Sequence, residues 1–150
     1  MANVPQVELL RDLVTHLRTA GLPQSPTVRP AIIPANRREE IADRTVVTVV
    51  PGVPKSERAT RAVVRVGHVF DVAIQRAVPT ATEAEGEVRD LDWPSVQAMM
   101  ELQRAVMLAL HAFPGVLAVE GVNAGAAEHA VQGVWTGVFR VTIRGENEPC

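Results

Sequence analysis

The sequence predicts an α+β fold, in which a mainly antiparallel β-sheet of four to five strands has two helices packed on it. Three patterns carry this prediction. Valines fill a β-branched run at 46–50, and residues 63–76 alternate apolar and polar side chains with the period of two that indicates a half-buried strand. Segments 5–20 and 95–112 repeat apolar residues at helical spacing. The two strand runs are joined by too few residues for a crossover helix, so they should pair as an antiparallel hairpin.

Composition bounds the class of protein. The 150 residues are expected to form one domain over 1–150, because a chain of this length can bury about 70% of its unfolded surface. A formal net charge of −2 predicts no general attraction to nucleic acid or to an anionic membrane. No apolar run approaches the ~20 residues that cross a bilayer, and the N-terminus lacks a signal-peptide layout. The sequence therefore predicts a soluble, intracellular protein.

The first helix is expected from Pro5 to Ala20. Asn3 can cap it, with Gln6 three residues later completing a capping box, and Gly21 followed by Pro23 ends it. The buried stripe of this helix is expected to contain six aliphatic residues: Val7, Leu9, Leu10, Leu13, Val14 and Leu17.

Four prolines between positions 23 and 34 exclude a helix there. Residues 27–33 can form a strand, and Pro30 places this strand at a sheet edge because proline cannot donate to a ladder. The charged residues 37–40 are expected in a solvated turn or short helix.

The connection within the hairpin, residues 51–62, is longer than usual and net basic. Long tips on a rigid hairpin tend to carry contacts, so this loop is a candidate docking site for a partner, with a solvated loop as the alternative. The candidate docking residues are Lys55, Arg58 and Arg61.

Side chains of the long strand are expected to divide between two faces. The apolar face holds Val64, Val66, His68, Phe70, Val72 and Ile74, and the polar face holds Arg65, Gly67, Val69, Asp71, Ala73 and Gln75. His68 and Asp71 therefore lie on opposite faces and cannot act as a local acid–base pair. A buried histidine whose polar atoms are satisfied is expected instead.

The stretch 78–93 is polar and acidic. Its carboxylates are Glu83, Glu85, Glu87, Asp90 and Asp92, against the single cation Arg89. The spacing could suggest a divalent metal site, but no second ligand cluster accompanies it. A solvated loop without metal is expected.

The second helix is expected from Ser95 to Ala112, capped by Asp92 or Ser95 and ended by Pro114 and Gly115. One apolar stripe holds Val96, Met99, Met100, Gln103, Val106, Met107, Leu110 and Phe113, and a second holds Ala98, Leu102, Ala105, Ala109 and Ala112. A helix this apolar is covered on more than one side, by the sheet and by either the first helix or a neighbouring subunit. The candidate subunit interface consists of Ala98, Leu102, Ala105 and Ala109.

Two strands should close the sheet, at 116–122 and 133–144, with a turn of small residues at 123–127 between them. In the last strand, the helix-facing side is expected to hold Trp135, Phe139, Val141 and Ile143, and the side facing water or a partner Thr136, Arg140, Thr142 and Arg144. Residues 1–4 and 145–150 are expected to fray. Cys150, the single cysteine, excludes an internal disulfide and a multi-cysteine metal site.

No constellation of catalytic residues is evident in the sequence. The four histidines include no i, i+4 pair and no H-E-x-x-H pattern, and there is no G-x-S-x-G, no phosphate-binding glycine loop and no Cys–His pair. A concentrated basic face with stacking aromatics is also missing. We therefore assign no catalytic, cofactor-binding or metal-binding residue and expect no enzyme activity.

The order of these elements resembles that of a known family. A helix, a proline-marked edge strand, the valine strand Val46–Pro51, a long hairpin partner containing 71–75, a helix containing 99–110 and two closing strands follow one another. This order is similar to that of small tail-completion (head–tail joining) proteins of long-tailed bacteriophages and prophages, in particular the tail terminator group. The likeness spans about 7–144 and consists of hydrophobic patterns.

One position of the family pattern is matched and two features depart from it. Phe70 follows His68 at the offset where the family commonly has an aromatic residue, often Tyr. The chain has no Tyr, and its acidic loop from Val78 is extended.

The resemblance implies an α+β subunit of a six-fold ring that caps the tail tube, joins it to the neck and lets DNA pass without sequence-specific contact. It implies a virion protein without cofactor or reaction, whose partners are further copies of itself, the tail tube protein and neck or connector proteins. A neck or head–tail connector component is the alternative in the same class. A small cytoplasmic enzyme or ligand-binding domain that uses the polar sheet face is the alternative from another class.

Overall fold

The computed structural model describes residues 5–31, 45–77, 93–122 and 134–149. In chain order the elements are α1 (Pro5–Thr19), β1 (Thr27–Pro30), β2 (Thr45–Pro51), β3 (Lys55–Arg58), β4 (Val63–Ala77), α3 (Trp93–Ala112), β5 (Val116–Val122) and β6 (Val134–Pro149). The predicted α+β class is confirmed. The sheet has six strands in place of the expected four to five.

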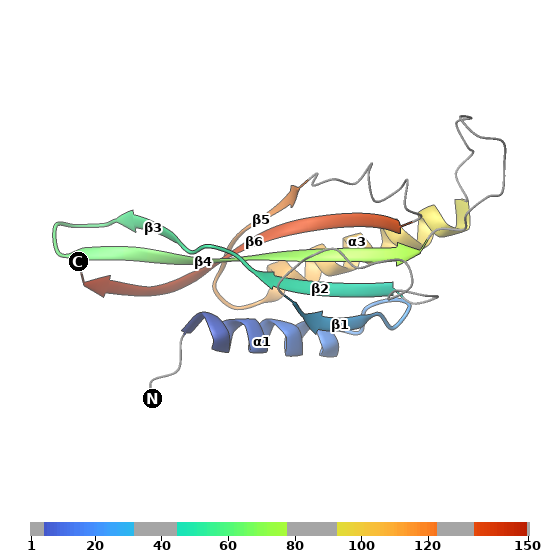
Figure 1. Cartoon of the computed structure of the whole chain (residues 1–150), viewed down its shortest axis with the longest axis horizontal. Coiled ribbons are helices and arrows are strands. Elements are labelled where there is room, and N and C mark those ends of the chain that lie inside the picture. The colour runs from blue at the N-terminus through green and yellow to red at the C-terminus, as the bar shows by residue number, and fades with distance from the viewer. Residues whose placement is uncertain (1–4, 32–44, 78–92, 123–133, 150) are drawn as a thin grey trace.

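The sheet is organised around β4, which is paired on both sides (Figure 1). The strand order is β1-β2-β4-β6-β5, and β3 pairs with the first part of β4 on the side that β2 occupies further along. Only β1 and β2 are parallel among these pairs. The predicted antiparallel hairpin is confirmed, with Val47 opposite Ile74 and Val49 opposite Val72.

The additional strand is β3, which lies in the stretch predicted as a loop. Its four residues, Lys-Ser-Glu-Arg, are all exposed and contain neither a β-branched residue nor an apolar alternation. The strand exists because β4 extends far enough to pair with it, from Lys55 opposite Gly67 to Arg58 opposite Val64. A short turn follows, in which the backbone N–H groups of residues 59 and 60 donate to the carbonyl of Val63.

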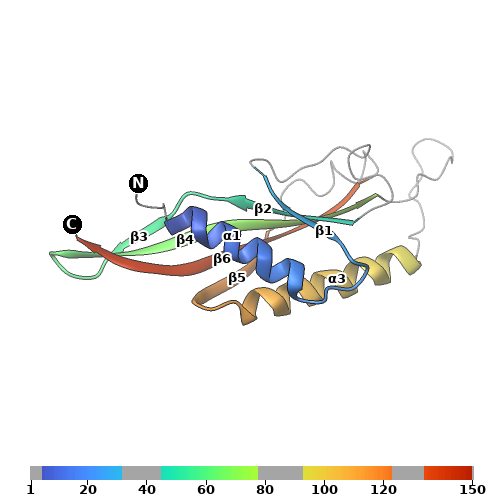
Figure 2. The ribbon, with the colours of Figure 1, turned by 90° about the horizontal axis from the view of Figure 1, so that it is seen from below.

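Both helices lie on one face of the sheet (Figure 2). Between the layers, fully or almost fully buried side chains form the core: Leu13, Leu17, Val47, Val49, Phe70, Val72, Ile74, Met99, Leu102, Val106, Leu110, Val141 and Ile143. The predicted inward positions Phe70, Val72 and Ile74 are therefore confirmed. Burial of thirteen aliphatic and aromatic side chains is the main source of stability expected for such a fold.

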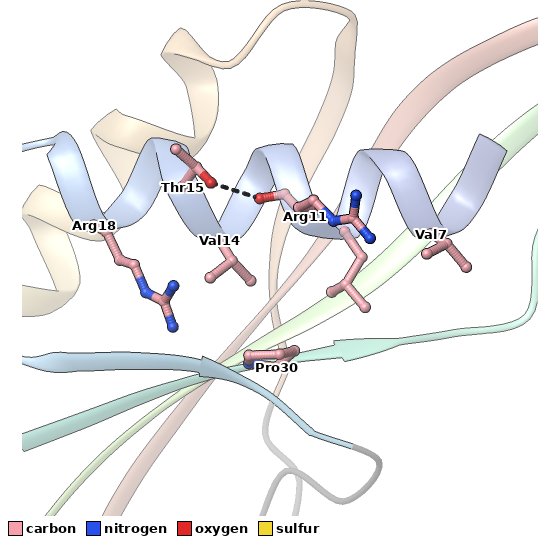
Figure 3. Close-up of a pocket in the computed structure, with 7 residues that line it drawn as sticks. Val7, Arg11, Val14, Thr15, Arg18 and Pro30 are labelled. Atoms are coloured by element: carbon pink, nitrogen blue, oxygen red, sulfur yellow. Dashed lines mark hydrogen bonds between the residues drawn. The ribbon is translucent and has the colours of Figure 1, made fainter. Parts of the chain in front are cut away.

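The first helix ends at Thr19, and Gly21 has a positive φ of 68°, the left-handed conformation that glycine adopts readily after a helix. Leu13, Val14 and Leu17 are buried as predicted. Val7 is 51% exposed, contrary to the predicted stripe. In Figure 3 it lies beyond Pro30, where β1 ends, so the first turn of the helix has less sheet to pack against.

The face of the sheet away from the helices is more enclosed than the alternation predicted. Ala73 and Gln75 are fully buried, and Thr136, predicted to face water or a partner, is 6% exposed. Gln75 donates a hydrogen bond from Nε2 to Thr136 Oγ1 at 3.3 Å. These residues belong to β4 and β6, which have a neighbouring strand on each side. The alternation of polar and apolar residues along one strand does not predict how much its neighbours cover it.

The last strand runs to Pro149 instead of ending at Arg144. Val63 lies opposite Pro149 and Val64 opposite Glu148, so the expectation that the chain frays from residue 145 is wrong. The fifteen residues of β4 supply a pairing partner along this whole length. The capping residue Asn3, the charged stretch 37–40, the acidic segment 78–92, the turn 123–127 and Cys150 lie outside the described residues.

Among the described helices, none combines the length and the apolarity needed to cross a membrane.

Candidate functional site

One end of the sheet extends beyond both helices (Figures 1 and 2). We call it the arm: β3, residues 63–68 of β4 and residues 144–149 of β6. The end of β6 and the turn between β3 and β4 lie at its tip. Val64 and Val66 are half-buried and Val53 is 85% exposed, so apolar surface is left open at the arm.

The three predicted docking residues all lie on the arm and are all exposed, but they do not form one surface. Lys55 is opposite Gly67 and Arg58 is opposite Val64. Because alternate residues of β4 point to opposite faces, Lys55 and Arg58 also lie on opposite faces of the arm. Arg61 lies in the turn at the tip. Separating Lys55 from Arg58 corrects the single docking loop that the sequence suggested.

On the face that carries Lys55, the arm is hollowed into a groove of about 640 Å³. We call it the arm groove. Its charged lining residues are Lys55, Glu57, Arg65 and Arg144, and Thr142 adds a hydroxyl. The described lining of the groove therefore carries three cationic side chains and one carboxylate.

Strand register explains why the cations gather in this groove. Gly67 of β4 lies opposite Lys55 on one neighbouring strand and opposite Arg144 on the other. A glycine between two long cationic side chains leaves the floor open, and a Cβ there would lie 3.2 Å from Thr142 Cγ2. Arg65, two residues before Gly67, adds the third cation on the same face.

The cationic side chains of the groove are exposed to solvent. Lys55, Arg65 and Arg144 are all exposed, and Glu57 is the carboxylate that lines the groove with them among the described side chains. A basic concavity of this kind attracts anionic groups.

Sequence reasoning missed Arg65 and Arg144 as members of this site. Both were placed on polar faces of their strands, which is correct, but nothing local connects them with Lys55. Recognition of β3 as a strand would have supplied the connection, since its register with β4 sets Lys55 and Arg65 on one face.

A second charged group crosses the middle of the same sheet face. Arg140 donates from Nε to Asp71 Oδ1 at 3.0 Å, and Glu120 lies opposite Arg140 on β5. The hydrogen bond to Asp71 and the charge of that carboxylate raise the pKa of Arg140, and Glu120 adds to this. An acid–base–acid row of this kind satisfies its own charges, and an ion pair this exposed contributes little to stability because solvent screens it.

Of the four residues predicted to form a subunit interface on α3, Leu102 is fully buried in the core, whereas Ala98, Ala105 and Ala109 are half-buried. The carbonyl oxygen of Ala98 accepts a hydrogen bond from Gln24 Nε2 at 2.6 Å, and that of Ala109 accepts one from His16 Nε2 at 2.7 Å. The first helix and the segment after it therefore contact α3, and the contact of α3 with a neighbouring subunit stays a prediction. Met100 and Leu108, 61% and 55% exposed, are the large apolar side chains that α3 leaves open.

The edge strand β1 is closed by the chain itself. Ala31 N–H donates to Val49 O at 3.0 Å, so the alternate residues Val28 and Pro30 direct their backbone groups away from β2. Pro30 has no N–H to offer, and Val28 O accepts two hydrogen bonds from Arg18, from Nε at 3.0 Å and Nη2 at 2.9 Å. This edge is thereby protected against pairing with another strand.

Figure 3 shows the hollow that this arrangement leaves between α1 and β1. It measures about 310 Å³ and is lined by Val7, Leu10, Arg11, Val14, Thr15, Arg18 and Pro30. Arg18 reaches from the helix toward the strand, and Thr15 Oγ1 donates to the carbonyl of Arg11 at 3.0 Å. The hydrogen bonds of Thr15 and Arg18 stay within the helix or go to the edge strand β1.

His68 is buried as predicted, at 8% exposure, but it is not fully satisfied. Its Nδ1 has no hydrogen-bond partner among the described residues. Gly145 lies directly against the ring, where a Cβ would come within 2.7 Å of Nε2 and 2.8 Å of Val66 O. The Nε2 side of the ring therefore packs against the backbone of Gly145.

Comparison with models of protein families and with curated protein sequences finds no match for this chain. Among the described residues, no group of three or more His, Cys, Asp or Glu is placed to hold a metal ion. The arm groove is the candidate functional site, and its cationic lining is suited to an anionic group.

Proposed function

We propose that this protein is a structural virion component of a long-tailed bacteriophage or prophage, a tail terminator whose copies form a ring that caps the tail tube and joins it to the neck. The order of elements supports the proposal. A helix, a proline-bearing edge strand, the valine strand, its long partner, a second helix and two closing strands follow one another as the resemblance requires.

The observation that carries the proposal is the arm. A subunit of a closed ring offers two different surfaces, one to each neighbour, because the contacts of a cyclic assembly are heterologous. The arm lies at one end of the sheet and the helix-covered body at the other, so the two ends of the molecule differ in shape (Figure 1). Since β1 is closed by Arg18 and Pro30, the contact surface is expected at the arm instead of at that edge.

In this proposal six copies form the ring, the tail tube and neck proteins are the partners, and DNA passes through the centre without sequence-specific contact. The protein acts in the virion and passes through the host cytoplasm during assembly. It performs no reaction and carries no cofactor. Arg61 at the arm tip and Arg58 beside it are the candidates for contact with the tube or neck.

The test is the mass of the native protein in solution, measured together with electron-microscopic class averages and labelling of purified particles. Closed rings, with the label at the head-proximal end of tails, are the expected result. Rings that label isolated heads and not tails would favour the connector role. A chain that stays monomeric at high concentration and is missing from particles would contradict both.

A further inference from the structure

The arm groove has its chemical complement elsewhere in the same sequence. Segment 78–92 carries five carboxylates against the single cation Arg89, whereas the groove holds Lys55, Arg65 and Arg144 against Glu57. Groove and segment are thus opposite in charge. Charge complementarity of this kind speeds association and selects one partner surface over others.

The segment cannot fill the groove of its own chain. It joins Ala77, at the end of β4, to Trp93, at the start of α3, and both anchors lie at the end of the molecule opposite the arm (Figures 1 and 2). The ten residue steps of β4 from Ala77 back to Gly67 cover about 33 Å. The sixteen steps from Ala77 to Trp93 span at most about 55 Å, so a segment held at both ends reaches out about 28 Å before it must return.

We propose that the arm groove of one copy binds the acidic segment 78–92 of the next copy, so that successive subunits join arm to opposite end. This inference rests on the proposed ring and names the surfaces that meet in it. A donor at one end and an acceptor at the other make a heterologous contact, which closes into a ring when the rotation between neighbours allows. The half-buried Val66 lines the groove and gives it apolar surface beside the charges.

A nucleic acid is the other anionic occupant to consider. Single-stranded nucleic acid is usually held by a basic channel together with aromatic side chains on which bases stack. None of the described residues lining the arm groove is aromatic. The charge of the acidic segment and the reach argument therefore favour a second copy of the chain.

The experiment measures assembly of the full-length protein by light scattering over a range of salt concentrations. Lys55→Glu with Arg65→Glu reverses the charge of the groove, and Glu83→Lys with Glu85→Lys and Glu87→Lys reverses the charge of the segment. Each of these two variants is expected to associate at least about tenfold more weakly than the native chain, and native assembly should weaken as salt screens the charges. Circular dichroism melts establish that each variant is folded.

The decisive step is restoration of binding. An equimolar mixture of the groove variant and the segment variant, or one chain carrying all five substitutions, should assemble again because every groove then meets a segment of opposite charge. The matched control is Arg58→Glu with Arg61→Glu, which changes the charge of the same arm by the same amount away from the groove. Assembly of this control in solution should match the native chain.

Several outcomes would overturn the inference. If the groove variant assembles like the native chain, the ring stands and this contact is wrong. The contact is also wrong if only the groove variant loses assembly, or if mixing restores nothing. If the native chain binds duplex or single-stranded DNA, and the groove variant loses that binding while still assembling, the occupant is nucleic acid. If the native chain is monomeric both in low salt and on purified tails, the proposed ring and the proposed contact are both wrong.

Discussion

Phe70 and Gly145 show how single residues determine the packing of this sheet. Phe70 is fully buried at the centre of the helix-facing side. Gly145 lies where β6 passes His68 and the carbonyl of Val66, too close for any side chain. One residue stabilises the core by filling it, and the other allows two strands of the arm to approach.

Replacing Phe70 by Ala is expected to lower the free energy of unfolding by about 3–5 kcal/mol, because the substitution leaves a cavity in the core. A chemical denaturation curve measures the change. A loss below about 1 kcal/mol would mean that Phe70 is not a core residue.

Gly145→Ala is expected to destabilise the protein by about 1–3 kcal/mol, since the added Cβ would overlap the Val66 carbonyl and the His68 ring. The matched control is Gly121→Ala on β5, where nothing lies within 4 Å of the new Cβ. There the substitution should be neutral or stabilising by up to about 1 kcal/mol, because alanine loses less backbone entropy on folding. Thermal melts of both variants measure the change in stability. Equal changes for the two variants would contradict the close approach at Gly145.

At the scale of elements, α3 illustrates how packing selects among apolar stripes. The helix offers apolar residues over much of its circumference, and the buried ones are Val96, Met99, Leu102, Val106 and Leu110. These residues combine members of both stripes that the sequence suggested, because α1 and the sheet meet the helix from two directions. Met100 and Leu108 are left outside.

This orientation of α3 predicts a contrast between two neighbouring residues. Leu102→Ala should cost about 2–5 kcal/mol of stability as a core truncation. Met100→Ala should change stability by no more than about 0.5 kcal/mol, as expected of an exposed position. Chemical denaturation of both variants in parallel measures the two losses of stability. A larger loss for Met100→Ala than for Leu102→Ala would mean that the helix is rotated about its axis.

At the scale of the whole molecule, the described residues form a helix-covered body with an arm that extends beyond both helices. The body is held by a continuous core, whereas the arm is held mainly by strand pairing with β4. Charges at the arm are exposed, so they contribute little to stability and are free to contact partners.

Reversal of charge at the arm tip, by Arg58→Glu with Arg61→Glu, should therefore leave the melting temperature unchanged. Within the proposed function it should weaken joining of tails to heads, and particle preparations should contain unattached heads and tails. Electron microscopy counts these, with native particles as the control. Normal yields of infectious particles from the double variant would show that the tip is not the docking surface.

Local patterns in the sequence were sufficient to predict α1, β2, β4, α3 and β5, because hydrophobic periodicity reflects which side of an element is buried. They also placed Pro30 at an edge and Phe70 in the core. For the candidate site, they proposed Lys55 as a docking residue, which stays a prediction, and placed Arg65 on the polar face of its strand, but they did not indicate the groove that both residues line.

Only the tertiary structure decided the features that depend on a distant pairing partner. The strand β3 and the last residues of β6 have no apolar pattern of their own, and they are strands because β4 is long enough to hold both. The burial of Gln75 and Thr136, the closure of the β1 edge by Arg18, and the meeting of Lys55, Arg65 and Arg144 follow from the same cause. Strand register brings together residues up to 89 positions apart, and a local period carries no information about register between segments so distant.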